Sequence, residues 1–519
     1  MPEANSNIFD LVVGQWEAAD PEGVAIRFGQ QSWTRGEFAT RIRRNAAAQR
    51  AAGVSPGERV AFLDKNHPAC LETTLGCALA GTANAVVNFR LAPEEIAYVI
   101  SDSGARVVFA GPEFLPLIEQ IRPQLPKVER VITVGGEADE YEQFLTTAPD
   151  AEPAHTARPD DCFLQLYTSG TTGRPKGVML THHCIAAHSR ATAAAADVNR
   201  DSVVMVPMPL FHVGGTSWAL AAMSVGAGIV VVRDIVPDQL LAQFGADGIT
   251  HAFLVPAVFG FFRQVPGVED YDYSSLRGLV YGASPMPAPL LRWAMETFSG
   301  VGFYQVYGMT EASGAVTLLL PEDHRDPDHP ERLLSAGRPL DGVEMRVVDP
   351  GTGQELPDGE VGEIQLRSEQ LMAGYWNRPA DTAATIVDGW LRSGDAGRRD
   401  EGGYYYVEDR VKDMIVSGGE NIYPAEVERV LVEHPDVAEV AVIGVPDDTW
   451  GETVKAIVVP RPGATIDATK LIEYCQPRLA RYKQPSSVEI TEALPRNATG
   501  KVLKRTLREP YWAARDRAI

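Results

Sequence analysis

Residues 167–182 read Tyr167-Thr-Ser-Gly-Thr-Thr-Gly-Arg-Pro-Lys-Gly-Val-Met-Leu-Thr-His182. The apolar Phe163-Leu164 pair before them predicts a short buried strand, and Thr181-His182 predicts the start of a helix. Between the two, small residues let backbone N–H groups approach an anion, hydroxyl groups add donors, and Lys176 adds positive charge. The spacing is not that of a Walker A loop. The stretch predicts a polyphosphate-binding loop, whereas a generic Gly/Ser/Thr cluster is an ordinary surface turn.

Four further motifs follow this loop, and together they point to one family. They are Tyr307-Gly-Met-Thr-Glu311, Gly389-Trp-Leu-Arg-Ser-Gly-Asp395, Asp409-Arg-Val-Lys-Asp-Met-Ile-Val-Ser-Gly-Gly-Glu-Asn-Ile-Tyr-Pro424 and Pro495-Arg-Asn-Ala-Thr-Gly-Lys501. In this order the motifs resemble the signatures of the adenylate-forming superfamily, and the overall pattern is most similar to its fatty-acid–CoA ligases. The resemblance implies an AMP-forming acid–thiol ligase, an acyl-CoA synthetase that uses ATP, Mg²⁺ and coenzyme A.

Composition is consistent with a folded enzyme and excludes several other classes. The chain has 519 residues, which is too long for a single hydrophobic core and predicts at least two domains. Hydrophobic residues make up 45% of it, as in a folded enzyme. A net charge of −22 argues against nucleic-acid binding and against adsorption to an anionic membrane. The five cysteines are scattered without metal-ligand spacing, and no signal peptide is apparent, so we expect a cytoplasmic protein. A homodimer is one open option for its oligomeric state.

Short apolar runs separated by helical stretches predict an α/β fold. Before residue 410 they indicate βα units with largely parallel sheets, and the segment from Val343 to Gln365 indicates a more barrel-like β subdomain. After it, a helix opening at Pro424, strands over 438–445, 454–459 and 488–490, and a helix over 471–479 predict a small α+β domain. We therefore expect a large N-terminal domain over 1–410 and a small mobile C-terminal domain over 411–519. The resemblance places the hinge near Lys412.

The resemblance also assigns the residues that would bind the nucleotide. Glu311 corresponds to the Mg²⁺ ligand, Thr310 to a donor toward the α-phosphate, and Lys501 to a mobile catalytic lysine that bridges carboxylate and α-phosphate. Asp395 would accept hydrogen bonds from the ribose hydroxyls with help from Arg410. The other residues expected to bind nucleotide or coenzyme A are Thr168, Ser169, Gly170, Thr171, Thr172, Gly173 and Lys176 for the phosphates, Gly282, Ala283, Ser284 and Tyr307 for adenine, and Gly418, Gly419 and Glu420 for the pantetheine passage.

Apolar and very small residues predict the pocket for the acid. The segments expected to line it are residues 211–215, 255–262 and 308–316. They contain no Lys or Arg that could pair a second carboxylate, so we expect a hydrophobic monocarboxylic acid, whether fatty, aryl or alicyclic. His212 is either a core histidine or a flexible gate, and the resemblance favours the gate. The residues expected to contact the acid are His212, Val213, Gly214, Gly215, Phe259, Gly308 and Gly314.

Two alternatives remain open at this stage. The chain could be a stand-alone adenylation or thioesterification partner that passes acyl groups to a carrier protein instead of coenzyme A, and it could run one half-reaction only. It could also be an acyl-adenylate binder without catalysis, which the presence of Lys176, Glu311, Asp395 and Lys501 disfavours.

Overall fold

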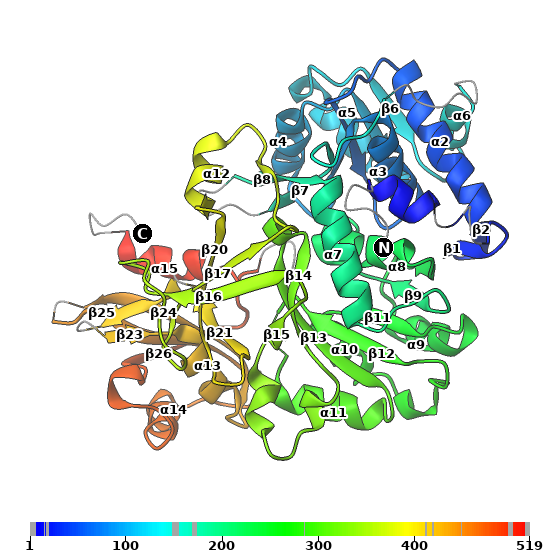
Figure 1. Cartoon of the computed structure of the whole chain (residues 1–519). Coiled ribbons are helices and arrows are strands. Elements are labelled where there is room, and N and C mark those ends of the chain that lie inside the picture. Colours follow the sequence, from blue (N-terminus) through cyan, green and yellow to red (C-terminus); the bar gives the residue numbers. More distant parts are fainter. Residues whose placement is uncertain are drawn as a thin grey trace. The chain divides into compact units, whose positions relative to one another are not determined.

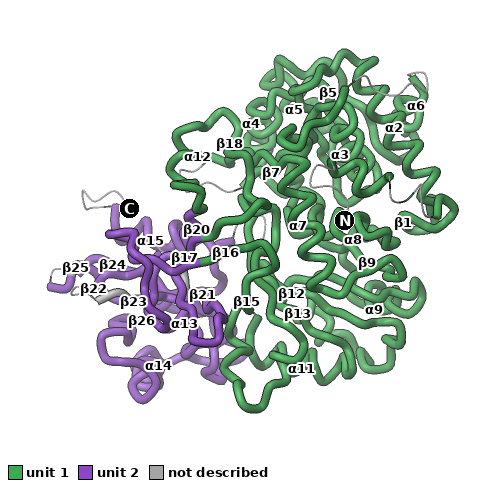
Figure 2. Tube along the Cα trace, viewed as in Figure 1, with its two compact units in different colours: residues 1–345, 366–391 green, residues 346–365, 392–519 purple. Residues whose placement is uncertain are grey.

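The computed structural model describes residues 7–14, 16, 20–147, 155–168, 174–284, 286–410, 413–417, 420–447, 449–496 and 502–513. The chain forms two compact units, residues 1–345 with 366–391, and residues 346–365 with 392–519 (Figure 2). Compactness thus groups the strands around residues 346–365 and 392–410 with the C-terminal residues, whereas the predicted domain boundary follows residue 410. Lys412, the predicted hinge, lies outside the described residues, and that boundary stays a prediction.

A seven-stranded sheet in the first unit carries both ends of the phosphate loop. Its central strands are parallel, and two antiparallel strands, β8 and β18, close one edge (Figure 1). The order across the sheet is β18 (Gly374–Tyr375), β8 (Lys176–Thr181), β7 (Cys162–Thr168), β4 (Ala83–Val86), β3 (Arg59–Leu63), β5 (Val107–Ala110) and β6 (Arg130–Thr133). The strand expected at Phe163-Leu164 is β7, and β3 is buried at every position, as parallel strands covered on both faces require.

A nine-stranded sheet in the same unit carries the Thr310-Glu311 turn. Its order is β15 (Arg338–Pro339), β14 (Gly314–Leu319), β13 (Gly302–Met309), β12 (Gly278–Gly282), β11 (His251–Leu254), β9 (Val203–Val206), β10 (Gly228–Val231), β1 (Val24–Phe28) and β2 (Gln31–Thr34). The strands from β13 to β1 are parallel, and β2, β14 and β15 pair antiparallel at the two edges.

Helices cover these two sheets, and one hydrophobic core joins them. Phe62 and Phe163 of the seven-stranded sheet share that core with Val204 and Ile229 of the nine-stranded sheet and with Trp218 of α8. The helices of this unit are α2 (Arg35–Ala51), α3 (Pro68–Ala80), α4 (Pro93–Ser103), α5 (Leu115–Ile121), α6 (Glu140–Leu145), α7 (His182–Ala195), α8 (Val213–Ser224), α9 (Pro237–Ala246), α10 (Pro256–Phe262), α11 (Ala288–Thr297) and α12 (Pro379–Thr385). The helix predicted to start at Thr181 is confirmed as α7. Thr181 is its N-cap, and the hydroxyl of Thr181 accepts a hydrogen bond from the backbone N–H of Cys184.

The region between residues 202 and 232 contains no long apolar helix. Proline and glycine residues divide it into β9, α8 and β10. Among the helices that the structure describes, none is long and apolar enough to cross a membrane.

Two further sheets, each of five strands, follow along the chain. The first confirms the β subdomain predicted from Val343 onward, and its outer strand β21 pairs with β20. The second belongs to the predicted small α+β domain, where β24 and β25 form a long hairpin. The strands are β16 (Val343–Val348), β17 (Gly362–Ser368), β19 (Ile386–Val387), β20 (Trp390–Arg399) and β21 (Tyr405–Arg410), then β22 (Ile415–Ser417), β23 (Glu420–Ile422), β24 (Val437–Asp447), β25 (Gly451–Pro460) and β26 (Ser487–Ile490).

The helices of this region are α13 (Pro424–Val432), α14 (Ala468–Cys475) and α15 (Lys504–Trp512). Pro424 opens α13 at its first position, as predicted. The helix expected over 471–479 is displaced toward the N-terminus. It begins earlier because Asp467 caps it through the backbone N–H of Thr469, and it ends at Cys475 because Pro477 has no backbone N–H that could continue the hydrogen-bond ladder.

Candidate active site

The two ends of the phosphate loop lie side by side at the edge of the seven-stranded sheet. Thr168 is the last residue of β7, Lys176 is the first of β8, and the antiparallel register pairs these two residues directly. The loop between them, with Ser169, Gly170, Thr171, Thr172 and Gly173, lies outside the described residues.

Lys176 is held by an acid and an aromatic ring. Its Nζ lies 3.3 Å from Oδ1 of Asp381 in α12, and 5.0 Å from the ring centroid of Tyr375 in β18. Only 12% of the lysine side chain is exposed, so both contacts fix a largely buried charge. These two contacts orient the ammonium group.

Glu311 is brought to the same place from the nine-stranded sheet. It follows β13 in a short 3-10 turn over Thr310–Ala312, in which Thr310 is buried. Its carboxylate oxygen Oε1 accepts a hydrogen bond from the hydroxyl of Tyr375 at 2.9 Å and from that of Thr168 at 3.4 Å. Three predicted residues, Thr168, Lys176 and Glu311, thus meet around a single tyrosine.

The donor set fits a magnesium ion that takes most of its ligands from a nucleotide. Among the described residues no group of three or more His, Cys, Asp or Glu side chains gathers to hold an ion. Within the same part of the chain, Oε2 of Glu311 has no hydrogen-bond partner, while Oε1 has two. One free carboxylate oxygen is what Mg²⁺ uses when substrate phosphates and water complete its octahedron.

The predicted adenine residues sit at the carboxyl end of parallel strands. Gly282 ends β12 and lies opposite Val306 of β13, so Ala283 and Ser284 follow at the same edge as Tyr307. A Cβ on Gly282 would stand 2.2 Å from the carbonyl oxygen of Val306, which explains the glycine. Ala283 adopts φ +64°, a left-handed conformation that turns the chain at this edge and leaves it exposed. Ligands of open α/β sheets bind at such edges.

Asp395 and Arg410 lie in the second unit, directly opposite each other on β20 and β21. Asp395 is 4% exposed, and its backbone N–H donates to the hydroxyl of Ser393 at 3.0 Å. The sequence placed these two residues on one ribose, and the antiparallel register brings their backbones together. Glu420 is the first residue of β23. The side chains of Glu420 and Arg410 lie outside the described part of the structure. The predicted residues Lys412, Gly418, Gly419 and Lys501 lie outside the described residues.

The predicted acyl residues gather at the start of α8. His212 is the N-cap, and its Nδ1 accepts a hydrogen bond from the backbone N–H of Gly214 at 3.2 Å. Burial lowers the pKa of His212, which keeps the ring neutral and able to accept. Val213 is buried behind it. A Cβ on Gly215 would stand 2.3 Å from the carbonyl oxygen of Pro209, so the backbone is packed too closely for any side chain.

Gly308 and Gly314 stand on neighbouring strands, where β13 and β14 leave the Glu311 turn. A Cβ on Gly308 would lie 1.9 Å from the carbonyl oxygen of Gly314. Gly314 itself has φ +135°, and a Cβ there would lie 2.5 Å from Nε2 of His188. Buried His188 accepts through that nitrogen from the backbone N–H of Ala315, so glycine is required at both positions by packing as well as by any substrate.

Phe259 is placed differently from the other predicted acyl residues. It is fully buried in α10, and its ring packs against those of Tyr281 and Phe303 in the core beneath the nine-stranded sheet. The structure thus describes Phe259 as a core side chain, and its contact with the acid stays a prediction.

Sequence inspection missed three side chains of this region. Tyr375 and Asp381 contact Lys176, and Asn66 fixes the loop that leads to His212. Gly374-Tyr375-Trp376 has no composition that marks a site. Asn66 stands between a buried strand and Pro68, a pattern typical of any turn before a helix.

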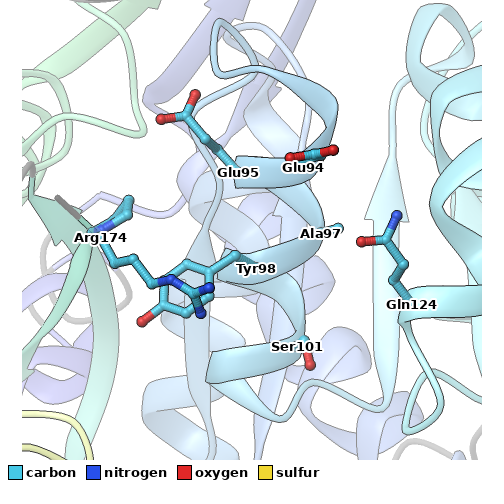
Figure 3. Close-up of a pocket in the computed structure, with 8 residues that line it drawn as sticks. Glu94, Glu95, Ala97, Tyr98, Ser101, Gln124 and Arg174 are labelled. Atoms are coloured by element: carbon cyan, nitrogen blue, oxygen red, sulfur yellow. The ribbon is translucent and has the colours of Figure 1, made fainter.

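A cavity of about 400 Å³ lies where the described chain resumes after the phosphate loop (Figure 3). Arg174 lies over the ring of Tyr98 at 5.1 Å on one side of it, as Figure 3 shows, and Gln124 lies on the other. Glu94 and Glu95 also line it. Two carboxylates at the wall disfavour a hydrophobic acid, so this cavity does not suit the acyl group.

Comparison with known proteins identifies the family of this chain. The family model described as AMP-binding enzyme matches residues 14–376, and that described as AMP-binding enzyme C-terminal domain matches residues 426–501. A fatty acid–[acyl-carrier-protein] ligase, ScoC, of Streptomyces coeruleorubidus is 39% identical over 92% of this chain and 91% of its own. A feruloyl-CoA synthase of Amycolatopsis is 39% identical over 96% and 99%, and the long-chain-fatty-acid–CoA ligase FadD13 of Mycobacterium tuberculosis is 38% identical over 90% and 92%.

Two solved structures are similar over almost the whole chain. ATP-bound MatB from Rhodopseudomonas palustris has a TM-score of 0.88 at 30% identity, covering 98% of this chain and 99% of its own. The o-succinylbenzoate CoA synthetase of Bacillus subtilis, in complex with its acyl-adenylate intermediate, has a TM-score of 0.86 at 30% identity, covering 99% and 100%. With the family model spanning more than half of the sequence, the chain belongs to the family of AMP-binding enzymes.

Proposed function

We propose that this AMP-binding enzyme is an ATP-dependent acyl-CoA ligase for a hydrophobic carboxylic acid. A carboxylate oxygen of the acid attacks the α-phosphorus of ATP, the bond to pyrophosphate breaks, and acyl-AMP forms. The thiol of coenzyme A then attacks the acyl carbon, and AMP leaves with the oxygen that the acid supplied. The observation that carries the proposal is the meeting of Thr168, Lys176 and Glu311, from two different sheets, at one point.

Lys176 and the hydroxyl of Thr168 would hold the departing phosphates. Asp381 and Tyr375 orient Lys176, and Glu311 orients the hydroxyl of Thr168. Donors that the fold holds in place lower a barrier because they need little reorganisation during the reaction. Glu311 would hold Mg²⁺ through its free oxygen. When bound, the ion neutralises negative charge on the phosphates.

Residues further along the chain would bind the ribose and supply the catalytic lysine. Asp395 with Arg410 would bind the ribose, and Lys501 would bridge the carboxylate and the α-phosphate during adenylation only. We propose that the C-terminal domain turns about Lys412 between the half-reactions, which would bring Gly418, Gly419 and Glu420 to the pantetheine. A Lys412→Pro variant tests this step, because proline fixes φ. We expect it to adenylate normally and to fail in thioester formation; normal rates for both half-reactions would contradict the hinge.

The acid pocket would be apolar at its base. Helix α8 contains no charged residue, and its residues from Gly215 to Ser224 are all buried. A second carboxylate would remain unpaired against such a surface, at a large desolvation cost. Fatty, aryl and alicyclic acids fit this description, and the relatives include one named for feruloyl groups and one for long-chain fatty acids.

A carrier protein is the second candidate acceptor. The relative ScoC is named for transfer of a fatty acid to an acyl-carrier protein, and it is as similar to this chain as the feruloyl-CoA synthase. The pantetheine arm that accepts the acyl group is common to coenzyme A and to a carrier protein in its holo form.

The experiment supplies purified enzyme with ATP, Mg²⁺ and a panel of acids. Pyrophosphate release reports adenylation, and thioester formation is measured separately with coenzyme A and with a holo-carrier protein. We expect pyrophosphate release with hydrophobic monocarboxylates and a thioester with coenzyme A. Thioester with the carrier alone would favour the second candidate. Release with dicarboxylates or amino acids only would contradict the apolar pocket.

A further inference from the structure

One segment ties the phosphate strand to the Glu311 turn. The backbone N–H of Met372 donates to the carbonyl oxygen of Glu311 at 2.9 Å, and that of Ala373 donates to the carbonyl oxygen of Met179 in β8 at 3.0 Å. Gln370 donates through Nε2 to the carbonyl oxygens of Ala312 and Ala315, at 3.1 and 2.8 Å. Residues 370–373 are therefore hydrogen-bonded to the backbone of β8 on one side and to the backbone around the Glu311 turn on the other.

Tyr375 stands in the middle of that connection and is fixed by its own backbone. It pairs with Val178 as β18, and its N–H donates to the hydroxyl of Thr382 at 2.9 Å. Its side chain reaches two residues of the proposed nucleotide site: the hydroxyl donates to Oε1 of Glu311 at 2.9 Å, and the ring faces Nζ of Lys176 at 5.0 Å. Tyr375 is 7% exposed, so neither contact competes with bulk water.

The hydroxyl acts as a donor at neutral pH. A tyrosine hydroxyl carries its proton at neutral pH, and at 2.9 Å from Oε1 of Glu311 it is placed to donate. A donated bond to a carboxylate fixes which oxygen is occupied and which remains available to an ion. The ring face, negative at its centre, meanwhile attracts the Lys176 ammonium toward the same point.

We propose that Tyr375 is a positioning residue of the nucleotide site: its hydroxyl turns the free oxygen of Glu311 toward Mg²⁺, and its ring holds Lys176 for the phosphates. This inference rests on the proposed function, since it assumes that MgATP binds here. The proposal adds a residue of β18 that couples Glu311, the metal ligand, to Lys176, the phosphate-binding lysine. Neither of these two residues lies in β18.

The test separates the hydroxyl from the ring by calorimetric titration of ATP, with EDTA and then with saturating Mg²⁺. Tyr375→Phe keeps the ring and removes the hydroxyl. Partners of this kind typically contribute about 10–100-fold to metal affinity, so we expect the gain in ATP affinity on adding Mg²⁺ to fall at least about tenfold. Affinity in EDTA should be unchanged. Tyr375→Leu, which also removes the ring, should weaken ATP binding in EDTA as well.

Tyr406→Phe is the matched control. The hydroxyl of Tyr406 also donates to a carboxylate, Oδ2 of Asp400 at 3.1 Å, and a cation, Arg398, also lies over its ring at 4.0 Å. It should bind ATP like the wild type under both conditions. Thermal unfolding of each variant checks that the chain has folded.

Two results would overturn the inference. The first is an unchanged Mg²⁺-dependent gain in Tyr375→Phe, and the second is an equal loss with and without Mg²⁺. Wild-type enzyme without any Mg²⁺-dependent ATP binding would instead refute the proposed function, on which the inference rests.

Discussion

Removing the Asn66 side chain should damage the acyl pocket without touching the nucleotide site. Its Nδ2 donates to the carbonyl oxygens of Met208 and Val232, both at 3.0 Å, and its Oδ1 accepts from the backbone N–H of Leu210 at 2.9 Å. These bonds hold the loop that runs into His212, the N-cap of α8. All four of these residues are at most 7% exposed.

The magnitude follows from the three backbone groups that Asn66→Ala leaves without a partner. A buried unsatisfied group costs about 1–3 kcal/mol, so the native loop loses about 3 kcal/mol even at the lower bound. That is equivalent to about a hundredfold in an equilibrium constant, enough to populate other loop conformations. Water that enters the loop can replace some of the lost hydrogen bonds and recover part of this loss. We therefore expect the KM for the acid to rise at least about tenfold. The KM for ATP should stay unchanged.

The assay is pyrophosphate release with the acid varied at saturating ATP, and Asn84→Ala is the control. Asn84 in β4 is also fully buried, but its Nδ2 donates to the hydroxyl of Thr74 in α3 at 2.9 Å. This bond does not involve the loop that leads to His212. It should lower the melting temperature and leave the acid KM unchanged. Equal acid KM values for the two variants would refute the assignment of Asn66 to the pocket loop.

Three further predictions use other parts of the chain. Gly308→Ala should impair pyrophosphate release, because its Cβ would stand 1.9 Å from a backbone oxygen, whereas Gly260→Ala, with open space and helical backbone, should be neutral or stabilising; equal activity of both would contradict the packing argument. Burial lowers the pKa of His188 to about 4, below its unfolded value of 6.5, so its contribution to stability is complete above pH 6.5 and is lost as the pH falls toward 4. Between pH 7 and 5 the melting temperature should therefore fall less steeply for His188→Gln than for the wild type. Parallel curves would count against this role of His188. Lys501→Ala should lose about 10²–10³ in pyrophosphate release and still convert supplied acyl-adenylate to thioester, and equal loss of both steps would remove its assigned role.

Local patterns predicted the elements, and non-local pairing decided the site. The strand at Phe163 and the helix after Thr181 follow from apolar runs and a capping hydroxyl, which act over a few residues. The end of α14 was predicted too far along the chain, although Pro477, which has no backbone N–H to continue a helix, stands in the sequence. By contrast, Tyr375 reaches Glu311 only because β18 pairs with β8, and no property of Gly374-Tyr375-Trp376 specifies that partner.

The grouping of the β subdomain could not be predicted in the same way. Residues 346–365 precede the expected boundary by a long stretch of chain, yet they belong to the compact unit that contains residues 392–519. Strand patterns indicate that a sheet forms, but contacts between distant segments determine which unit it joins.

The central claim, that a carboxylate attacks the α-phosphorus of ATP, can be tested by following one oxygen atom. The enzyme is given an accepted hydrophobic acid labelled with ¹⁸O at both carboxylate oxygens, together with ATP, Mg²⁺ and coenzyme A, and the products are analysed by mass spectrometry. We expect each AMP formed to carry one ¹⁸O and the pyrophosphate to carry none. Label in inorganic phosphate with ADP as the product, or AMP without label, would contradict the account.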